Sequence, residues 1–154
     1  MLAKIKQLKE FINSNNIITF LSGAGLSTAA GIPDFRSDIE GFWKKNKPVK
    51  YSEFLKNEES QNKSWSNNIA IINSIKRKKR TKMHNFIDKF LMESKKNTHI
   101  TQNIDGFHYS KRLSSQIFEL HGSVRSAHCL NCKTAYDPDF FFKNHVQSTG
   151  SCLC

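Results

Sequence analysis

The stretch IITFLSGAGLSTAA, residues 17–30, decides the fold. Its opening segment, Ile17–Leu21, is rich in β-branched residues and follows the turn formers of residues 13–16, which predicts a strand buried on both faces. Residues 22–25, Ser-Gly-Ala-Gly, then predict a tight turn, and helix-tolerant residues continue to Ala30. The order strand, glycine turn and helix predicts one unit of a parallel α/β sheet.

The rest of the chain alternates between helical and strand patterns. Apolar residues at helical spacing predict amphipathic helices over residues 3–13 and 83–94. Short runs predict strands at residues 99–101 and 116–120, whereas residues 37–75 show no sustained period and predict short helices joined by mobile loops. Together these elements predict an α/β fold with a mainly parallel sheet in one domain.

The composition is that of an intracellular globular protein. Of the 154 residues, 38% are apolar and 24% are charged, so a packed core is expected rather than disorder. No apolar run approaches the length of a membrane span, and the opening MLAKIKQLKE lacks the apolar core of a signal peptide. We therefore expect a protein of the nucleus or cytoplasm that has no membrane partner.

Positive charge is concentrated in one run. The formal net charge is +11, and residues 76–80, Lys-Arg-Lys-Lys-Arg, are all basic, with Lys82 close behind. Such runs can be nuclear localisation signals or nucleic-acid patches, because clustered cations release condensed counterions when they bind phosphate. The alternative, which so permissive a motif favours, is a solvated loop or helix end.

The glycine turn and the loop after it carry groups suited to a dinucleotide. Glycines between a strand and a helix let backbone N–H groups approach a pyrophosphate, although an empty tight turn is the other interpretation. The residues beyond Pro33 add an acid, an aromatic ring and a guanidinium, which could cover a ribose or nicotinamide or simply form core and a surface pair. The candidate residues are Gly23, Ala24, Gly25, Asp34, Phe35 and Arg36.

Polar residues also follow the two later strands. Gln102, Asn103, Ile104 and Asp105 come at the carboxyl end of a predicted parallel strand, where open α/β sheets bind ligands. Amide and carboxylate groups there can hold ribose hydroxyls or a carboxamide, or can cap a turn. His121 follows the next strand and precedes a glycine, so it is a candidate general base, although a lone histidine is more often structural.

The four cysteines lie together near the end of the sequence. Cys129 and Cys132 form a CxxC pair, and Cys152 and Cys154 form a CxC pair. Because disulfides rarely persist in reducing compartments, this clustering indicates four thiolates around one structural zinc, with His128 or His145 as substitute ligands.

These motifs, in this order, resemble the sirtuin family. The resemblance is carried by four segments and extends from about residue 10 to the last residue, with Gly41-Phe42-Trp43 and His84 adding to it. The segments are residues 23–27 with 31–36, residues 101–105, His121-Gly122, and Cys129-x-x-Cys132.

The resemblance implies an NAD-dependent protein-lysine deacylase with a Rossmann-like domain and a structural zinc. It implies that NAD binds at the glycine turn, that Asn103 and Asp105 hold the nicotinamide end, and that the acyl-lysine oxygen attacks the ribose carbon. His121 is then the base that acts on a ribose hydroxyl, and Phe35 and Arg36 shield the reacting ribose. Asn103 and His121 are the catalytic candidates, and histones are among the candidate substrates.

The resemblance also implies a domain division and an incomplete fold. Residues 1–122 correspond to part of the NAD-binding domain and residues 123–154 to part of the zinc module. Sirtuins continue with a Gly-Thr-Ser turn and further strands that have no counterpart here. We therefore expect these residues alone to bind NAD poorly and to turn over little substrate.

Two alternatives remain open from the sequence. An enzyme of the same fold could transfer ADP-ribose to protein, since both reactions begin at the same ribose carbon. A zinc-stabilised binding protein without catalysis could instead use residues 76–80 to hold nucleic acid or another partner.

Overall fold

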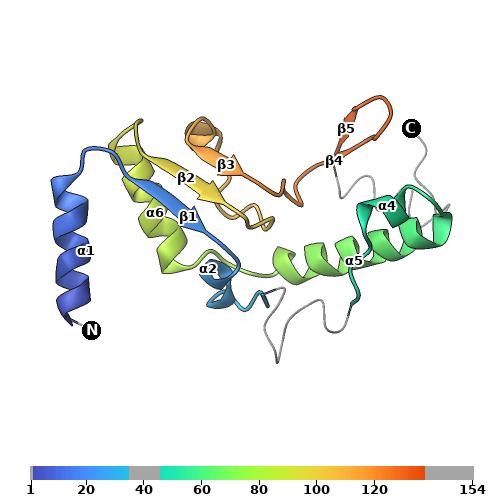
Figure 1. Cartoon of the computed structure of the whole chain (residues 1–154), viewed down its shortest axis with the longest axis horizontal. Helices are drawn as coiled ribbons and strands as arrows, with labels where there is room; N and C mark the ends of the chain where they lie inside the picture. The colour runs from blue at the N-terminus through green and yellow to red at the C-terminus, as the bar shows by residue number, and fades with distance from the viewer. Residues whose placement is uncertain (1, 35–45, 138–154) are drawn as a thin grey trace.

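The computed structural model describes residues 2–34 and 46–137. Two sheets and a set of helices make up the described chain (Figure 1). In chain order the elements are α1 (Leu2–Ser14), β1 (Thr19–Ser22), α2 (Gly25–Thr28), α4 (Tyr51–Phe54), α5 (Glu58–Lys76), α6 (Lys82–Glu93), β2 (Thr98–Thr101), the 3₁₀ helix η1 (Lys111–Leu113), β3 (Ile117–Glu119), β4 (Ala127–His128) and β5 (Ala135–Tyr136).

The larger sheet is parallel, as the sequence predicted. Its order is β1-β2-β3, and the register places Phe20 beside His99 and His99 beside Ile117. The helix α6 packs on the sheet face that carries Phe20, His99 and Ile117. There Phe20 and Ile117 contact a core that contains Ile87 and Leu91. The smaller sheet pairs β4 with β5 in antiparallel fashion.

The prediction that the first strand is buried on both faces is wrong for the described structure. Leu21 is 70% exposed and Phe118 is 51% exposed, and the register places Ile100 between them. The reason is that α6 covers one face, whereas no described element packs on the other. This sheet face, Leu21–Ile100–Phe118, is therefore apolar and open.

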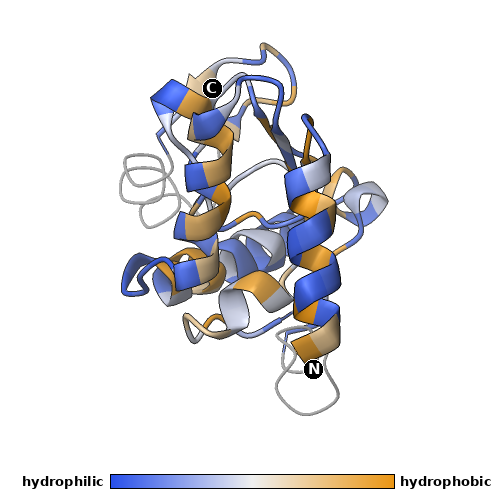
Figure 2. Ribbon diagram, turned by 90° about the vertical axis from the view of Figure 1, so that its left-hand side faces the viewer, coloured by the Kyte–Doolittle hydropathy of each residue, from blue (hydrophilic) through white to orange (hydrophobic). Residues whose placement is uncertain are grey.

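The helix α1 forms where its spacing predicted, yet none of its residues is buried. The apolar residues appear as orange bands along an otherwise blue helix (Figure 2). They are Leu2, Ile5, Leu8 and Phe11, which are 55–82% exposed. In the described structure the amphipathic helix thus forms, but no other element covers its apolar side.

The prediction of short helices and mobile loops up to residue 75 is wrong from Glu58 onward, because α5 is a single helix of 19 residues. Asn57 caps it, with the side chain accepting from Ser60 N at 2.7 Å, and acidic residues fill the first turn. Its buried apolar residues, among them Ile71 and Ile75, gather in the second half. The polar first half hid the helical period. Residues 37–45 lie outside the described residues.

Candidate active site

The glycine turn lies between β1 and α2, as predicted. Leu26 N donates to Gly23 O at 3.0 Å, and Ser27 N donates to Ala24 O at 2.9 Å. The space where a Cβ on Gly25 would project is open to 4 Å. The turn borders a cavity of about 810 Å³ that it shares with the start of α6. The helix α2 has only four residues, so its dipole is small. An anion in this cavity would therefore be bound mainly by the backbone N–H groups of the turn.

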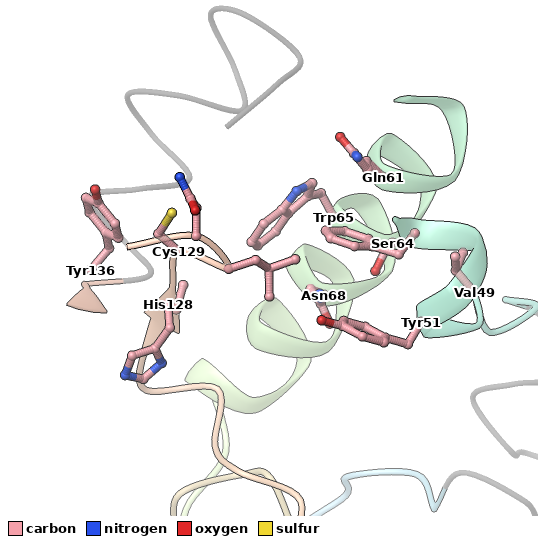
Figure 3. A pocket seen from close by; sticks show the side chains of 13 residues that line it. Val49, Tyr51, Gln61, Ser64, Trp65, Asn68, His128, Cys129 and Tyr136 are labelled. Atoms are coloured by element: carbon pink, nitrogen blue, oxygen red, sulfur yellow. The ribbon is translucent and has the colours of Figure 1, made fainter. Parts of the chain in front are cut away.

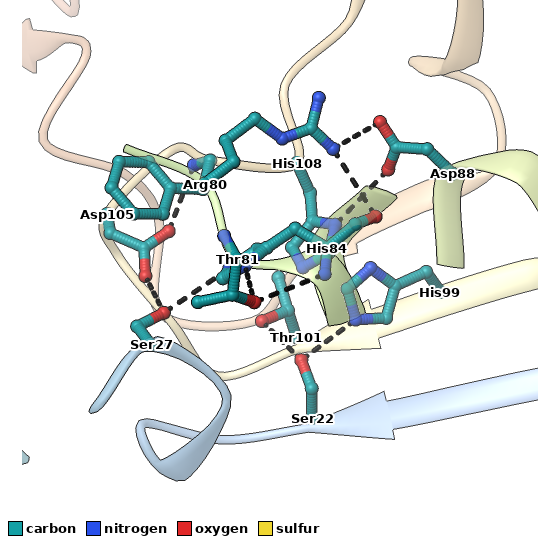
Figure 4. A network of polar contacts seen from close by, with 11 residues as sticks. Ser22, Ser27, Arg80, Thr81, His84, Asp88, His99, Thr101, Asp105 and His108 are labelled. Carbon is teal, nitrogen blue, oxygen red and sulfur yellow. Dashed lines mark hydrogen bonds and ion pairs between the residues drawn. The ribbon is translucent and has the colours of Figure 1, made fainter. Parts of the chain in front are cut away.

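Asn103 and Asp105 are buried directly after β2, and Ser27 joins them. Ser27 Oγ donates to Asp105 Oδ2 at 2.6 Å and accepts from Asn103 Nδ2 at 3.3 Å. Because Thr81 N donates to His84 Nδ1 at 3.0 Å, the other nitrogen of that ring carries its proton and faces Ser27 Oγ at 3.4 Å. The hydrogen bonds from Asn103 and His84 thus converge on Ser27, whose hydroxyl donates to the Asp105 carboxylate. Figure 4 shows the His84, Ser27 and Asp105 part of this network.

The second carboxylate oxygen is held by the backbone. Asp105 Oδ1 accepts from Phe107 N at 2.9 Å, which closes a turn through Gly106, whose φ is +71°. With a donor on each oxygen, the carboxylate is fixed as an acceptor in a buried position. The sequence predicted that these residues would cap a turn or hold a ligand, and the geometry allows Asp105 to do both.

Three separately predicted segments meet at a small cavity. Ala24 of the glycine turn, Pro33 of the loop and Asn103 after β2 line a space of about 20 Å³ that α5 closes on one side. Ile104 and Asp105 complete the lining on the β2 side. Asp34 is partly buried at the end of the described loop. Phe35 and Arg36 lie outside the described residues.

His121 lies in the open after β3, beside Gln102. Its Nδ1 is 3.0 Å from Gln102 O, and because a carbonyl only accepts, Nδ1 carries the proton of the neutral ring. The unprotonated Nε2 is then the atom that can accept a proton. His121 also lines a cavity of about 250 Å³ together with Ile104 and Trp65. Gln102 is exposed as well.

Three buried histidines, of which the sequence singled out only His84, form a cluster under this site (Figure 4). The rings of His99 and His108 are 4.0 Å apart between centroids, and those of His84 and His108 are 4.6 Å apart. His99 Nε2 bonds to Ser22 Oγ at 2.8 Å, and His108 Nδ1 donates to Asp88 Oδ1 at 3.3 Å. The three rings are at most 2% exposed.

The cluster is held in its uncharged form. Burial lowers the pKa of His99 to about 4. Burial, reinforced by the neighbouring His99 and His84, lowers the pKa of His108 to about 2, and burial also lowers the pKa of His84. Arg80 forms an ion pair with Asp88 beside them, so the last residue of the basic run 76–80 makes a structural contact although it remains exposed.

Sequence reasoning missed Ser27, Ser22 and Thr101 as site residues, and it gave His99 and His108 no role. Their contacts join residues far apart in the chain, such as Ser27 and Asp105, 78 positions apart. All three residues lie within the quoted segments 17–30 and 101–105, but those patterns gave none of them a role.

The CxxC pair lies on a tight turn between β4 and β5. Cys129 N donates to Thr134 O at 3.0 Å, Lys133 N donates to Cys129 O at 3.0 Å, and Lys133 has φ of 62°. Neither Cys129 nor Cys132 forms a disulfide. Within residues 2–34 and 46–137, no group of three or more His, Cys, Asp or Glu side chains could hold a metal, and Cys152 and Cys154 lie outside this range.

Another cavity, mostly apolar, lies away from Asn103 and Asp105. It measures about 520 Å³ and opens between α4 and α5 on one side and the β4–β5 turn on the other (Figure 3). The Trp65 ring of α5 faces the Cys129 segment across it. Trp65 and His128 also border the His121 cavity, so the two spaces adjoin.

No membrane-spanning helix occurs in the described part of the chain. None of its helices combines the length and the apolar character that crossing a bilayer requires.

Known proteins resemble this chain in sequence and in structure. A protein named NAD-dependent protein deacetylase from Staphylococcus epidermidis is 34% identical over 155 residues, which cover 96% of this chain and 61% of that protein. Another of the same name from Clostridium perfringens is 36% identical, covering 92% of this chain and 59% of that protein. The chain spans 59–61% of the length of three such relatives.

Solved structures give the same result. A Sir2 variant with a deacetylated p53 peptide and 3′-O-acetyl ADP-ribose superposes with a TM-score of 0.79 at 27% identity, covering 97% of this chain and 59% of that one. A complex described as Sir2 with p53 peptide and NAD⁺ gives a TM-score of 0.75 at 25% identity, covering 97% of this chain and 58% of that one. The Sir2 family pattern matches residues 23–154. The predicted resemblance is thus confirmed, and the chain belongs to the Sir2 family.

Proposed function

We propose that the protein is an NAD-dependent protein-lysine deacylase whose activity requires a polypeptide of about the length of its relatives. The observation that carries this proposal is the Ser27 bridge, which holds Asn103 and Asp105 side by side at a cavity bordered by the glycine turn. The names of the relatives and the NAD⁺ and acetyl-ADP-ribose complexes of neighbouring structures support NAD and acyl-lysine as substrates.

The residues of this chain divide the work. Gly23, Ala24 and Gly25 offer backbone N–H groups to the pyrophosphate of NAD, in the open space beside Gly25. Asn103 and Asp105 bind the nicotinamide end, where the buried carboxylate gives a fixed acceptor.

His121 supplies the base. Its Nδ1–H bond to Gln102 O leaves Nε2 to accept the proton of a ribose hydroxyl after the acyl oxygen has displaced nicotinamide at the ribose carbon. The hydroxyl oxygen then bonds to the acyl carbon, the lysine nitrogen leaves as the free amine, and a water molecule adds to that carbon, so that the products are lysine and O-acyl-ADP-ribose. We assign Asp34, Phe35, Arg36, Gln102 and Ile104 to the wall of the NAD site.

We further propose a structural zinc bound by Cys129, Cys132, Cys152 and Cys154. The tight turn at Cys129 and the CxxC spacing fit a cation that takes four thiolates and leaves no open position for substrate. The metal would hold the module of residues 123–154 together. The NAD-binding part would then comprise residues 1–122.

Location and protein targets follow from the same proposal. We place the enzyme inside the cell, and the basic residues 76–80 favour the nucleus. Histones are then one class of target. A plasmid carrying the basic run fused to a fluorescent protein tests the first point, and diffuse fluorescence would remove the argument.

The deciding experiment uses the longest polypeptide expressed from the gene. Incubated with NAD and an acetyl-lysine peptide, it should release nicotinamide and O-acetyl-ADP-ribose in equal amounts, and Asn103→Ala should lower this rate at least about 100-fold. Asn85→Ala, which removes an exposed amide on α6, is the matched control and should not change the rate. ADP-ribose found on the protein with the acetyl group retained would establish ADP-ribosyl transfer instead.

A further inference from the structure

A line of hydrogen bonds connects His99 in the buried cluster to the backbone of Asn103. His99 Nε2 lies 2.8 Å from Ser22 Oγ, Ser22 Oγ donates to Thr101 Oγ1 at 2.9 Å, and Thr101 Oγ1 accepts from Asn103 N at 3.1 Å. The line crosses from β2 to β1 and back to β2. It therefore ties the end of β1, just before the glycine turn, to the first residues after β2.

The direction of each proton follows from these contacts. Ser22 uses its only hydroxyl proton on Thr101, so it must accept from His99, whose Nε2 therefore carries the ring proton. Thr101 Oγ1 then accepts from two donors, Ser22 and Asn103 N. His99 Nδ1 is left as an unprotonated nitrogen, for which no partner lies within reach among the described residues.

Burial makes this line costly to break. His99 is fully buried, Thr101 is 2% exposed and Asn103 is 4% exposed, so water cannot easily replace a partner lost at these three residues, whereas Ser22 is half-buried. Asn103 is also held from its other end, since its side-chain amide donates to Ser27 Oγ. The backbone and the side chain of this one residue are thus fixed by separate contacts.

We propose that His99 is a positioning residue for Asn103: acting through Ser22 and Thr101, it fixes the backbone from which the Asn103 amide reaches the nicotinamide end of NAD. The inference rests on the role proposed for Asn103. His99 touches no substrate itself, and its contribution is to supply a buried N–H donor from a ring held between β1 and α6.

Only the neutral ring of His99 fits this role. A second proton would sit on Nδ1, where no acceptor waits, beside the imidazoles of His84 and His108. The other charged groups around the cluster are Asp88 on α6, which would favour the charged ring, and Arg80, which is paired to that carboxylate. Asp105 also faces the cluster from the loop after β2 and favours the charged ring.

The experiment measures amide hydrogen exchange by NMR in the 154-residue chain at pH 7, without NAD or peptide. His99→Val should speed exchange at the Asn103 amide about fivefold to tenfold relative to the Leu91 amide of the α6 core, because one net hydrogen bond is lost. His99→Gln should restore the wild-type ratio, since its side-chain N–H can replace the Nε2 donor. Ser22→Ala should speed exchange at the Asn103 amide as His99→Val does, and it replaces that variant in the experiment if His99→Val does not fold.

Ile100→Val, on the same strand but facing away from α6, is the matched control and should leave the ratio of the two amides unchanged. Equal acceleration at Asn103 and Leu91 would mean that His99 only stabilises the fold, and an unchanged ratio in both His99→Val and Ser22→Ala would remove the line of bonds altogether. Because no substrate is present, the result is independent of the deacylase proposal, which could fail while Asn103 remains held.

Discussion

At the scale of single residues, Ser27 is the contact on which the site depends. It is 1% exposed, and its hydroxyl serves both Asp105 and Asn103. Neither partner has a solvent-facing alternative, so the hydroxyl matters to stability as well as to geometry. A serine in a glycine motif is easily taken for a small helix-tolerant residue, yet here it joins the ends of two strands.

We expect Ser27→Ala to lower the free energy of unfolding of the chain by about 1–3 kcal/mol, because it leaves a buried carboxylate oxygen and a buried amide without their partner. Urea denaturation of the 154-residue chain measures this difference. Thr28→Ala, at the next and exposed position, should change stability by less than about 0.5 kcal/mol. Equal losses in the two variants would contradict the role given to Ser27.

At the scale of elements, α6 and β2 meet through imidazoles where most α/β layers use aliphatic side chains. His84 comes from α6, His99 from β2 and His108 from the loop beyond, and the three rings pack together under the site. Unlike an aliphatic contact, this one adds hydrogen bonds to Ser22, Ser27 and Asp88. It also makes the packing of α6 sensitive to pH.

Stability should fall as the pH drops from about 6.5 toward 4. The pKa values of the buried histidines are lower in the folded chain than in the unfolded one, so the unfolded chain binds more protons in this range. Each such histidine contributes about 1.4 kcal/mol per pH unit, and the full stability is present only above pH 6.5. Urea denaturation at pH 5 and pH 7 tests this, and His99→Gln should reduce the dependence by one proton. A pH-independent midpoint would contradict the buried neutral cluster.

The β4–β5 turn should respond to loss of the proposed metal. Cys132→Ser removes one thiolate, so we expect zinc bound per chain, measured by plasma mass spectrometry, to fall to near zero. Ser126→Ala, an exposed position outside the cysteine set, should keep the wild-type zinc content. A wild-type chain purified from zinc-containing medium with no bound zinc would refute the site.

At the scale of the whole molecule, the described structure leaves apolar surface open in two places. One is the sheet face Leu21–Ile100–Phe118, and the other is the stripe along α1. The chain spans only part of its relatives' length, for example 61% of the Staphylococcus epidermidis protein. Contiguous apolar surface of this kind usually marks a contact with further polypeptide.

We expect the 154-residue chain by itself to release little or no nicotinamide from NAD and an acetyl-lysine peptide, because the open sheet leaves the site incomplete. The measurement is nicotinamide production by the chain and by a polypeptide of the relatives' length. Robust turnover by the chain alone would overturn this expectation. Equal inactivity of both would instead count against the deacylase proposal.

The substitution Phe118→Lys tests whether the sheet face Leu21–Ile100–Phe118 is covered in a polypeptide of the relatives' length. In the 154-residue chain, where the side chain is 51% exposed, it should cost less than about 0.5 kcal/mol. In a polypeptide of the relatives' length it should cost at least about 2 kcal/mol if this face becomes buried. Phe20→Ala, on the face under α6, should destabilise both lengths alike.

The sequence by itself determined the order of most elements and the family. Strand and helix periods placed β1, β2, β3 and α6 within a few residues, and four ordered motifs indicated the Sir2 family. The sequence misjudged α5, because the polar first half of that helix carries no period, and it misjudged the burial of β1, because burial depends on what covers a strand. The periodicity of apolar residues indicates local backbone geometry, but it does not indicate which other elements will pack against a helix or strand.

Tertiary structure alone decided the contacts that make a site. Ser27 meets Asp105 across 78 positions, and Ser22 meets His99 across 77, because parallel pairing of β1 with β2 brings their carboxyl ends to one edge. The sequence supplied the groups at that edge. Which hydroxyl serves which carboxylate, and which ring is buried beside which, is fixed only when the sheet and α6 exclude water and limit each polar atom to the partners within its reach.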